Sequence, residues 1–378
     1  MKKFTFKAKN LIVVIILLAL SINFSYAQEM HNNINEIEQR ILTYEEALEM
    51  ALRRSYTARN AAADVERSQE LRDQSAQDLR YSRPEGPGND IQDLIARQEL
   101  QMYLARETSL GMSKRQLEII NENIGFEINS IFNEIIKTEN ELELLDTQIN
   151  TMGKKIQTMN LMVNNGLRSK LDYTTLNNQY QEVLKQQDIL KKALDNQYIK
   201  LNKAIGLDEK ERRLISKEIN YEPLEELDID LHINRMIARD PYIWNLEQQI
   251  SLSQNRLSLY TYNANQEPYR ALQIDKTKAE NNVNSAKQNL RESLRLRYNQ
   301  IQQLETQYRI QELKLKEANE NFTILELRFE LGMITKNDLL ETETQLKSLE
   351  VALKNIIIQH EELKQLIAKP YLAPDYLN

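Results

Sequence analysis

The chain has 378 residues, no cysteine, 8 glycines, 7 prolines and a formal net charge of −7. So few glycines and prolines argue against a β-rich or α/β domain, which needs frequent turns, and favour long helices. The acidic balance argues against nucleic acid as a partner, and the lack of cysteine excludes a disulfide framework and a lipid-modified cysteine.

The first 27 residues are typical of a cleavable secretory signal. Four lysines precede a purely apolar run, residues 11–20, and Ser25-Tyr26-Ala27 offers a small-x-small cleavage site. The apolar run is shorter than the about 20 residues that a membrane span needs. We therefore expect an exported protein of the cell envelope, periplasmic or associated with an outer membrane. An uncleaved N-terminal anchor is the alternative.

The first predicted helix follows a lead-in of residues 28–41. Thr43 and Glu46 have the spacing of a capping box, in which each side chain satisfies an amide at the start of a helix. The helix is expected to continue to about residue 81. Two prolines and two glycines in residues 82–90 then end it.

The next helix is predicted over residues 91–163, which corresponds to about 110 Å at about 1.5 Å per residue. A helix of that length belongs to a coiled coil or a bundle, because globular helices average about 12 residues. Its second half carries an apolar heptad stripe: Leu142, Leu145, Ile149, Met152, Ile156, Met159 and Val163. Gly166 is expected to end it, and a returning helix then runs to about residue 204.

A second copy begins near residue 228, after a charged linker. Its opening repeats a pattern from the first copy, since Met236, Arg239 and Tyr242 align with Met50, Arg53 and Tyr56. A helix is predicted from 228 to 262, although Pro241 lies within it. A second long helix follows the break at residues 263–269 and ends at Gly332, and the last helix returns to about residue 368.

Both predicted turns carry the same short signature. Residues 165–172 read NGLRSKLD and residues 331–338 read LGMITKND, so that glycine, lysine and aspartate coincide. A helical stripe with alternating steps of four and three follows each turn in the same register. The chain is therefore an internal repeat of two helical hairpins.

Two hairpins, a signal sequence and the Gly-x-x-x-x-x-Asp turn resemble the TolC family of outer-membrane efflux ducts. Residues 43–56, TYEEALEMALRRSY, look like the family's opening helix, in which proline often replaces Ser55; Pro241 occupies that place in the second copy. Residues 202–206, NKAIG, look like the close of its first returning helix. The resemblance covers residues 42–370 and implies an all-α fold of two tandem helix-hairpin repeats with very long coiled-coil-like helices.

One departure from the family concerns the segments between the helices of each copy. Family members thread two membrane strands through each, and two strands with a turn need roughly 22 residues. Residues 81–90 and 260–270 are too short, and residues 91–110 have a helical pattern. The sequence thus predicts a TolC-like α-barrel subunit lacking the membrane β-barrel strands.

The resemblance implies a homotrimer that docks a periplasmic adaptor (membrane fusion protein) of an inner-membrane pump through its hairpin turns. Gly166 and Gly332 would form the tip turns. The candidate aperture carboxylates are Asp172, Asp338 and Glu341. The candidate adaptor contacts are Arg168, Lys170 and Lys336.

Simpler interpretations of these residues exist. The glycines suit left-handed helix C-caps, and the two aspartates suit an N-cap or a first-turn carboxylate that faces the helix dipole. Glu341 and the basic residues suit a solvated turn. His360, on the apolar stripe, is expected to be a core histidine rather than a metal ligand.

These patterns divide the chain into five segments: a signal peptide (1–27), a first hairpin repeat (28–206), a linker (207–227), a second repeat (228–370) and a tail (371–378). No catalytic constellation, cofactor motif or metal spacing is present in the sequence, so we expect no enzyme activity and no cofactor. The leading hypothesis is a TolC-like helical duct of an export system. The alternative is a non-conducting helical scaffold protein of the cell envelope.

Overall fold

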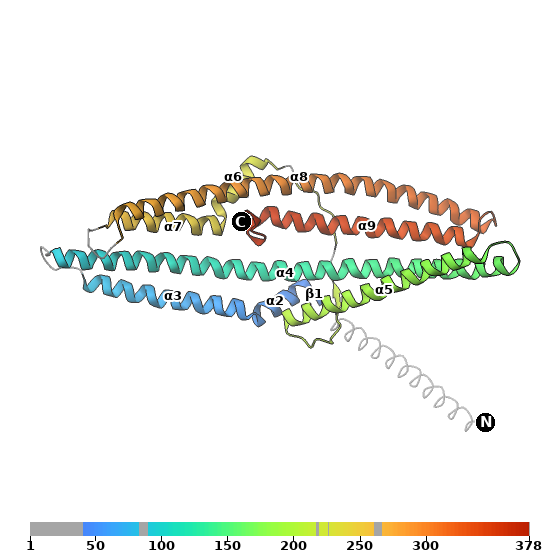
Figure 1. The fold of residues 1–378 in the computed structure, drawn as a ribbon, viewed down its shortest axis with the longest axis horizontal. Helices are drawn as coiled ribbons and strands as arrows, with labels where there is room; N and C mark the ends of the chain where they lie inside the picture. Colours follow the sequence, from blue (N-terminus) through green and yellow to red (C-terminus); the bar gives the residue numbers. More distant parts are fainter. Residues whose placement is uncertain (1–40, 83–89, 217–218, 226, 261–266, 378) are drawn as a thin grey trace, which may run out of the picture.

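The computed structural model describes residues 41–82, 90–216, 219–225, 227–260 and 267–377, and it is an elongated, almost wholly helical molecule (Figure 1). The predicted signal peptide and nearly all of the lead-in lie outside the described residues. So do residues 83–89 and 261–266, which hold most of the predicted breaks.

Each repeat contains two shorter helices, one very long helix and one returning helix. The first repeat consists of α2 (Tyr44–Arg54), α3 (Tyr56–Tyr81), α4 (Asp90–Asn164) and α5 (Lys170–Ile205). The second consists of α6 (Ile229–Arg239), α7 (Pro241–Ser258), α8 (Tyr269–Glu330) and α9 (Lys336–Ala368). The predicted all-α hairpin architecture is therefore confirmed, including helix over residues 91–110.

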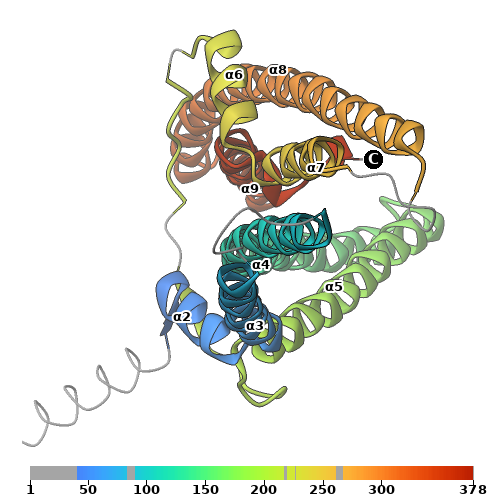
Figure 2. The ribbon, with the colours of Figure 1, turned by 90° about the vertical axis from the view of Figure 1, so that its left-hand side faces the viewer.

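The helices pack side by side as one open wall. Helices α7 and α9 lie end to end between α8 and α4, while α3 and α5 lie end to end on the other side of α4 (Figure 1). Interior helices thus have neighbours on both sides. Within the described part of the chain, α8 makes no extensive contact with α3 or α5, so these helices form the two edges of the wall. Figure 2 shows the same order along the axis.

Two predicted helices are interrupted in the structure. The helix expected over 44–81 breaks at Ser55, whose hydroxyl accepts from the Ala58 amide at 3.1 Å and so begins α3. The helix expected over 228–262 breaks at Asp240, where Pro241 has no amide to continue the α6 ladder. The Asp240 carboxylate accepts from the amides of Tyr242 and Ile243 and so begins α7.

A small parallel sheet, missed in the sequence, closes the first repeat. Strand β1 (Ile41–Thr43) pairs with β2 (Leu214–Ser216), with Leu42 opposite Ile215. The chain reaches β2 by a turn at Gly206, whose φ of +81° favours glycine. Buried Asn202 holds this turn by donating to the carbonyls of Asp208 and Glu211 at 2.8 Å. Thr43 and Glu46 form the predicted capping box.

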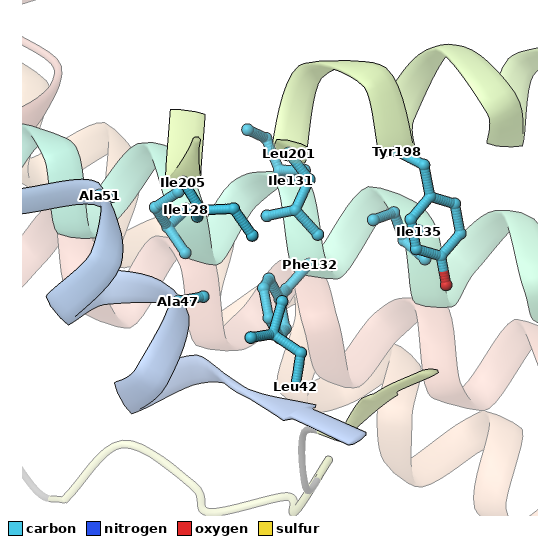
Figure 3. Packing of buried hydrophobic residues seen from close by; sticks show 10 residues of the cluster. All are labelled: Leu42, Ala47, Ala51, Ile128, Ile131, Phe132, Ile135, Tyr198, Leu201 and Ile205. Atoms are coloured by element: carbon cyan, nitrogen blue, oxygen red, sulfur yellow. The ribbon is translucent and has the colours of Figure 1, made fainter. Parts of the chain in front are cut away.

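The hydrophobic core of the first repeat gathers at mid-length, beneath this sheet. Side chains from β1, α2, α4 and α5 converge there (Figure 3), with Leu42, Phe132 and Leu201 at most 1% exposed. The second repeat has its own core at the junction of α6, α7 and α8, around Ile243, Leu290 and Leu294. Both cores therefore lie near the middle of the rod.

Residues 370–377 form two short 3₁₀ turns: η1 (Pro370–Leu372) packs on α4 and α9, and η2 (Asp375–Leu377) packs on α8 at the second core. Tyr376 is 2% exposed, and its hydroxyl donates to Asp240. Buried Arg297 donates to the carbonyls of Leu366 and Ala373 at 3.0 and 2.7 Å and to Asp375 at 2.9 Å. Residues 371–377, which fall within the predicted tail, thus join α7, α8 and α9.

A polar ladder joins the two repeats along α4 and α9. The partners step regularly in opposite directions: Thr158 with Asn337, Thr151 with Thr344, Asn140 with Lys354, Asn133 with Glu362 and Asn129 with Gln365. Such hydrogen bonds fix the register of two antiparallel helices more specifically than apolar contacts do.

Candidate functional site: the two hairpin tips

Both hairpins turn through the same backbone device. The Gly166 amide donates to the Val163 carbonyl at 3.0 Å, and the next amide donates to Met162 at 2.8 Å. The Gly332 turn repeats this pattern at 2.9 and 2.8 Å. With φ of +71° and +72°, both glycines are C′ residues of Schellman motifs. The predicted role of these glycines as left-handed caps is therefore what the structure shows.

The return helices begin with matching capping boxes. The hydroxyl of Ser169 accepts from the Asp172 amide at 3.1 Å, and the Asp172 carboxylate accepts from the Ser169 amide at 3.2 Å. Thr335 and Asp338 form the same pair at 3.3 and 2.9 Å. The doubled signature now has a physical explanation: glycine ends one helix, a hydroxyl residue three positions on starts the next, and aspartate completes the cap.

Asp172 and Asp338 are thus first-turn carboxylates, while Ser169 and Thr335 are the N-caps. Hydrogen bonds from the Thr335 hydroxyl and amide hold the pKa of Asp338 below its usual range. Sequence reasoning did not single out Ser169 and Thr335, although a Ser/Thr-x-x-Asp spacing was there to be read.

Glu341 lies on the side of α9 that faces the first repeat. Its carboxylate forms an ion pair with Lys155 of α4, and nearby Asn337 donates to the Thr158 hydroxyl at 3.1 Å. Lys155 also contributes to the lowered pKa of Asp338. The second tip is therefore tied to α4 through polar contacts from two residues of its return helix, Asn337 and Glu341.

The three basic candidates differ in their surroundings. Arg168 and Lys170 are exposed at the first tip. At the second tip, the ammonium of Lys336 lies 5.2 Å from the centre of the Phe329 ring, a cation–π contact within its own hairpin. The first tip thus presents two extended cations, and the second presents one held against an aromatic ring.

Exposed apolar side chains also gather at both tips. They are 64–73% exposed and flank the glycines: Leu161, Leu167, Leu171, Leu331 and Met333. Leu167 and Met333 follow their glycines directly, in a position that usually packs back on the helix. Clustered exposed apolar residues rimmed by charge are typical of protein-binding surfaces.

His360 lies far from the tips, in the interior. It is 2% exposed, its Nε2 lies 3.3 Å from the Glu305 carboxylate, and burial lowers its pKa. In the described residues, no group of His, Asp and Glu is arranged to hold a metal ion. None of the described helices combines the length and the hydropathy of a membrane-crossing segment.

The arrangement of these helices matches solved outer-membrane channels. The channel CmeC of Campylobacter jejuni aligns with a TM-score of 0.62 at 10% identity, over 87% of this chain and 85% of that one. VceC of Vibrio cholerae aligns with a TM-score of 0.62 at 13% identity, over 87% and 95%. CusC aligns with a TM-score of 0.59 at 13% identity, over 87% and 91%.

No protein-family model and no curated protein sequence matches the chain. The structural similarity therefore defines the fold, and that fold is the TolC-like helical hairpin repeat, as the doubled signature predicted. These three solved proteins that share it are channels of the outer membrane.

Proposed function

We propose that this chain is a TolC-like component of an export system in the cell envelope. Three copies close into a helical duct, and the hairpin tips dock a periplasmic adaptor of an inner-membrane pump. The single observation that carries the proposal is the open wall with two unpaired edges, because such a wall satisfies its edge helices only by closing on further copies.

The tip halves of the edge helices support closure. From Tyr308 to its end, α8 has one partly buried stripe: Tyr308, Gln311, Leu315, Ala318, Phe322, Leu325 and Phe329. On the remaining face, Leu313 and Leu327 are 68% and 58% exposed. A long helix that packs on one side only is stabilised when a second neighbour covers its other face.

The tip chemistry supports docking of a protein partner. Arg168 and Lys170 extend from the first tip beside exposed Leu167, while Lys336 lies beside Met333 at the second. We assign these residues to the adaptor contact. The first turns of the return helices carry three carboxylates, Asp172, Asp338 and Glu341. In a trimer these carboxylates would surround the tip opening, where they would favour cations.

The test is the mass and shape of purified residues 28–378. Light scattering should give a trimer, and end-on views by negative-stain electron microscopy should show a ring with a central hole. A strictly monomeric protein at high micromolar concentration, with and without adaptor, would contradict the proposal. A compact dimer without a hole would favour the non-conducting scaffold.

Adaptor docking is tested by reversing charge at the tip. Arg168→Glu with Lys170→Glu should weaken adaptor binding in a pull-down with the purified adaptor. Lys200→Glu with Lys203→Glu is the matched control, because it also reverses two charges on exposed α5 surface at the other end of the helix. Equal binding by the tip variant and the control would remove these residues from the site.

A further inference from the structure

Two exposed helix faces at opposite edges of the wall have matching patterns. On α5, the exposed face reads at heptad spacing Leu171, Thr175, Asn178, Glu182, Lys185, Ile189 and Lys192. On α8, it reads Ile310, Leu313, Glu317, Glu320, Ile324, Leu327 and Leu331. Both faces alternate steps of three and four, as the a and d positions of a coiled coil do.

Two apolar residues on each face have the same spacing. The separation of Leu171 from Ile189 along α5 equals that of Leu313 from Leu331 along α8. All four side chains are 58–73% exposed. Since α5 runs away from the tips and α8 runs toward them (Figure 1), the two pairs can meet together when the helices pack antiparallel.

The same alignment brings opposite charges together in one layer and like charges together in the next. It places Glu317 of α8 opposite Lys185 of α5, one turn from the contact between Leu313 and Ile189. Lys185 has a long contact of 3.9 Å to Asp188 one turn along the same helix. Beside this layer, Lys316 of α8 lies next to the position of Asp188. Glu320 falls opposite Glu182, and Lys185 lies one turn from that pair.

The positions of the two faces along the long axis of the molecule, called heights here, agree with this register. Gln187 of α5 bonds to Asp146 of α4. Asp146 lies between Glu143, which pairs with Lys347 of α9, and Thr151, which bonds to Thr344. Leu349, half a turn beyond Lys347, accepts from Gln311 of α8 at 3.1 Å. Ile189 and Leu313 therefore lie at similar heights, and rotation of a copy about an axis along the rod keeps them so.

We propose that the partner of each edge is a second copy of this chain, with α8 of one copy antiparallel to α5 of the next. The register places Leu313 on Ile189, Glu317 on Lys185 and Leu331 on Leu171. The contact is heterologous, since different faces meet, so it cannot form a twofold dimer, and it forms the proposed ring when three copies close the rotation. The inference rests on the proposed ring and adds which residues build each joint.

Cysteine cross-linking tests the register directly, because the natural chain has no cysteine. Leu313→Cys with Ile189→Cys should give covalent dimers and trimers on mild oxidation. Two matched controls keep Leu313→Cys and move the second cysteine one heptad either way, to Glu182→Cys or Asn196→Cys. All of these positions are exposed in the single chain, so the subunit fold is unaffected. The controls should cross-link at least about tenfold more slowly, since Cα atoms beyond about 7 Å do not bridge.

A charge exchange gives a second measurement. Glu317→Lys should raise the concentration at half-assembly by about tenfold, because it puts like charges together in each joint. Adding Lys185→Glu should restore it. Faster cross-linking of a control pair, or failure of Lys185→Glu to restore assembly, would overturn the register. If light scattering still gives the mass of a trimer, the proposed ring would stand. A protein that stays monomeric by light scattering overturns the ring as well, so the two failures are distinct.

Discussion

The middle of the rod and its tip half are built differently, although the same long helices run through both. At mid-length, side chains from four elements surround Phe132 and Ile135, which are 0% exposed, and Leu290 and Leu294 are equally buried in the second repeat. Toward the tips, α5 and α8 each pack on one neighbour and leave most of their surface exposed.

This difference indicates where one copy is sufficient and where it is not. The sheet, the linker turn and residues 370–377 add cover only at mid-length, so a single chain can complete its core there. The tip half has no such additions among the described residues, and α5 and α8 gain a second neighbour only from another copy. Stability should therefore be intrinsic in the middle and dependent on assembly at the tips.

The largest expected effect removes a side chain from the middle. Phe132→Ala should lower the free energy of unfolding by about 3–5 kcal/mol, since it opens a cavity among β1, α2 and α5. Urea unfolding followed by circular dichroism measures it. Leu313→Ala is the control at the tip half and should change the monomer by less than about 0.5 kcal/mol. Equal losses of unfolding free energy in the two variants would contradict the difference between the middle and the tip half.

A second prediction compares two arginines of α8. Arg297→Met leaves two part-buried carbonyls, of Leu366 and Ala373, without the donor that Arg297 supplies, and should cost about 2–3 kcal/mol. Arg295→Met, whose partner Asp230 is exposed, should cost less than about 1 kcal/mol. If thermal unfolding shows the same loss for both, residues 370–377 do not contribute to the core as described.

Glycine substitutions sharpen the description of the tips. Gly332→Ala forces a left-handed backbone on alanine and should cost about 1–2 kcal/mol, although a Cβ there meets no atom within 4 Å. Gly153→Ala is the matched control, because it has equal space within α4 and should stabilise by about 0.5–1 kcal/mol. Effects of the same sign would show that backbone conformation does not govern the turn.

Acid should act on the middle through His360. Burial lowers its pKa, so the folded state binds this proton less readily than the unfolded chain does. The stabilisation is complete above the unfolded pKa of about 6.5 and is lost as the pH falls from there toward the folded pKa. His360→Gln should flatten the melting temperature between pH 6.5 and about 5 relative to the parent. An unchanged slope would assign the acid loss to other groups.

The smallest predicted effect concerns cations at the assembled tip. If Asp338 and Glu341 surround an opening, calcium should raise the melting temperature of the trimer by neutralising crowded carboxylates. Asp338→Asn with Glu341→Gln should abolish that response. Identical calcium dependence in variant and parent would leave Asp338 as a cap and Glu341 as the partner of Lys155.

Much of the fold could be predicted because the hairpins depend on local signals. Helix ends at Gly166 and Gly332, the capping box at Thr43 and the heptad stripe from Leu142 to Val163 are all set by residues close in sequence. The prediction of one continuous helix across Asp240 was wrong, because Pro241 begins a new helix there. Continuation of the helix past Ser55 was wrong for a similar reason, since a serine can cap a helix as well as lie within it.

Long-range features could not be predicted from one sequence. The pairing of β1 with β2 joins two strands of three residues, each too short to show alternation. Burial of Tyr376 against Asp240 depends on tertiary packing, and so does the ion pair of Glu341 with Lys155. The candidate site was found as a pair of turns, while the contacts that orient its carboxylates required the structure.

Amide hydrogen exchange at two protein concentrations tests the central claim most directly. Dilution to the monomer should speed exchange in residues 170–190 of α5 and 310–330 of α8, which lose their second neighbour. Exchange in residues 128–135 and 290–297 should stay the same, because one chain completes the middle. Equal protection of the tip halves in monomer and trimer would contradict the account.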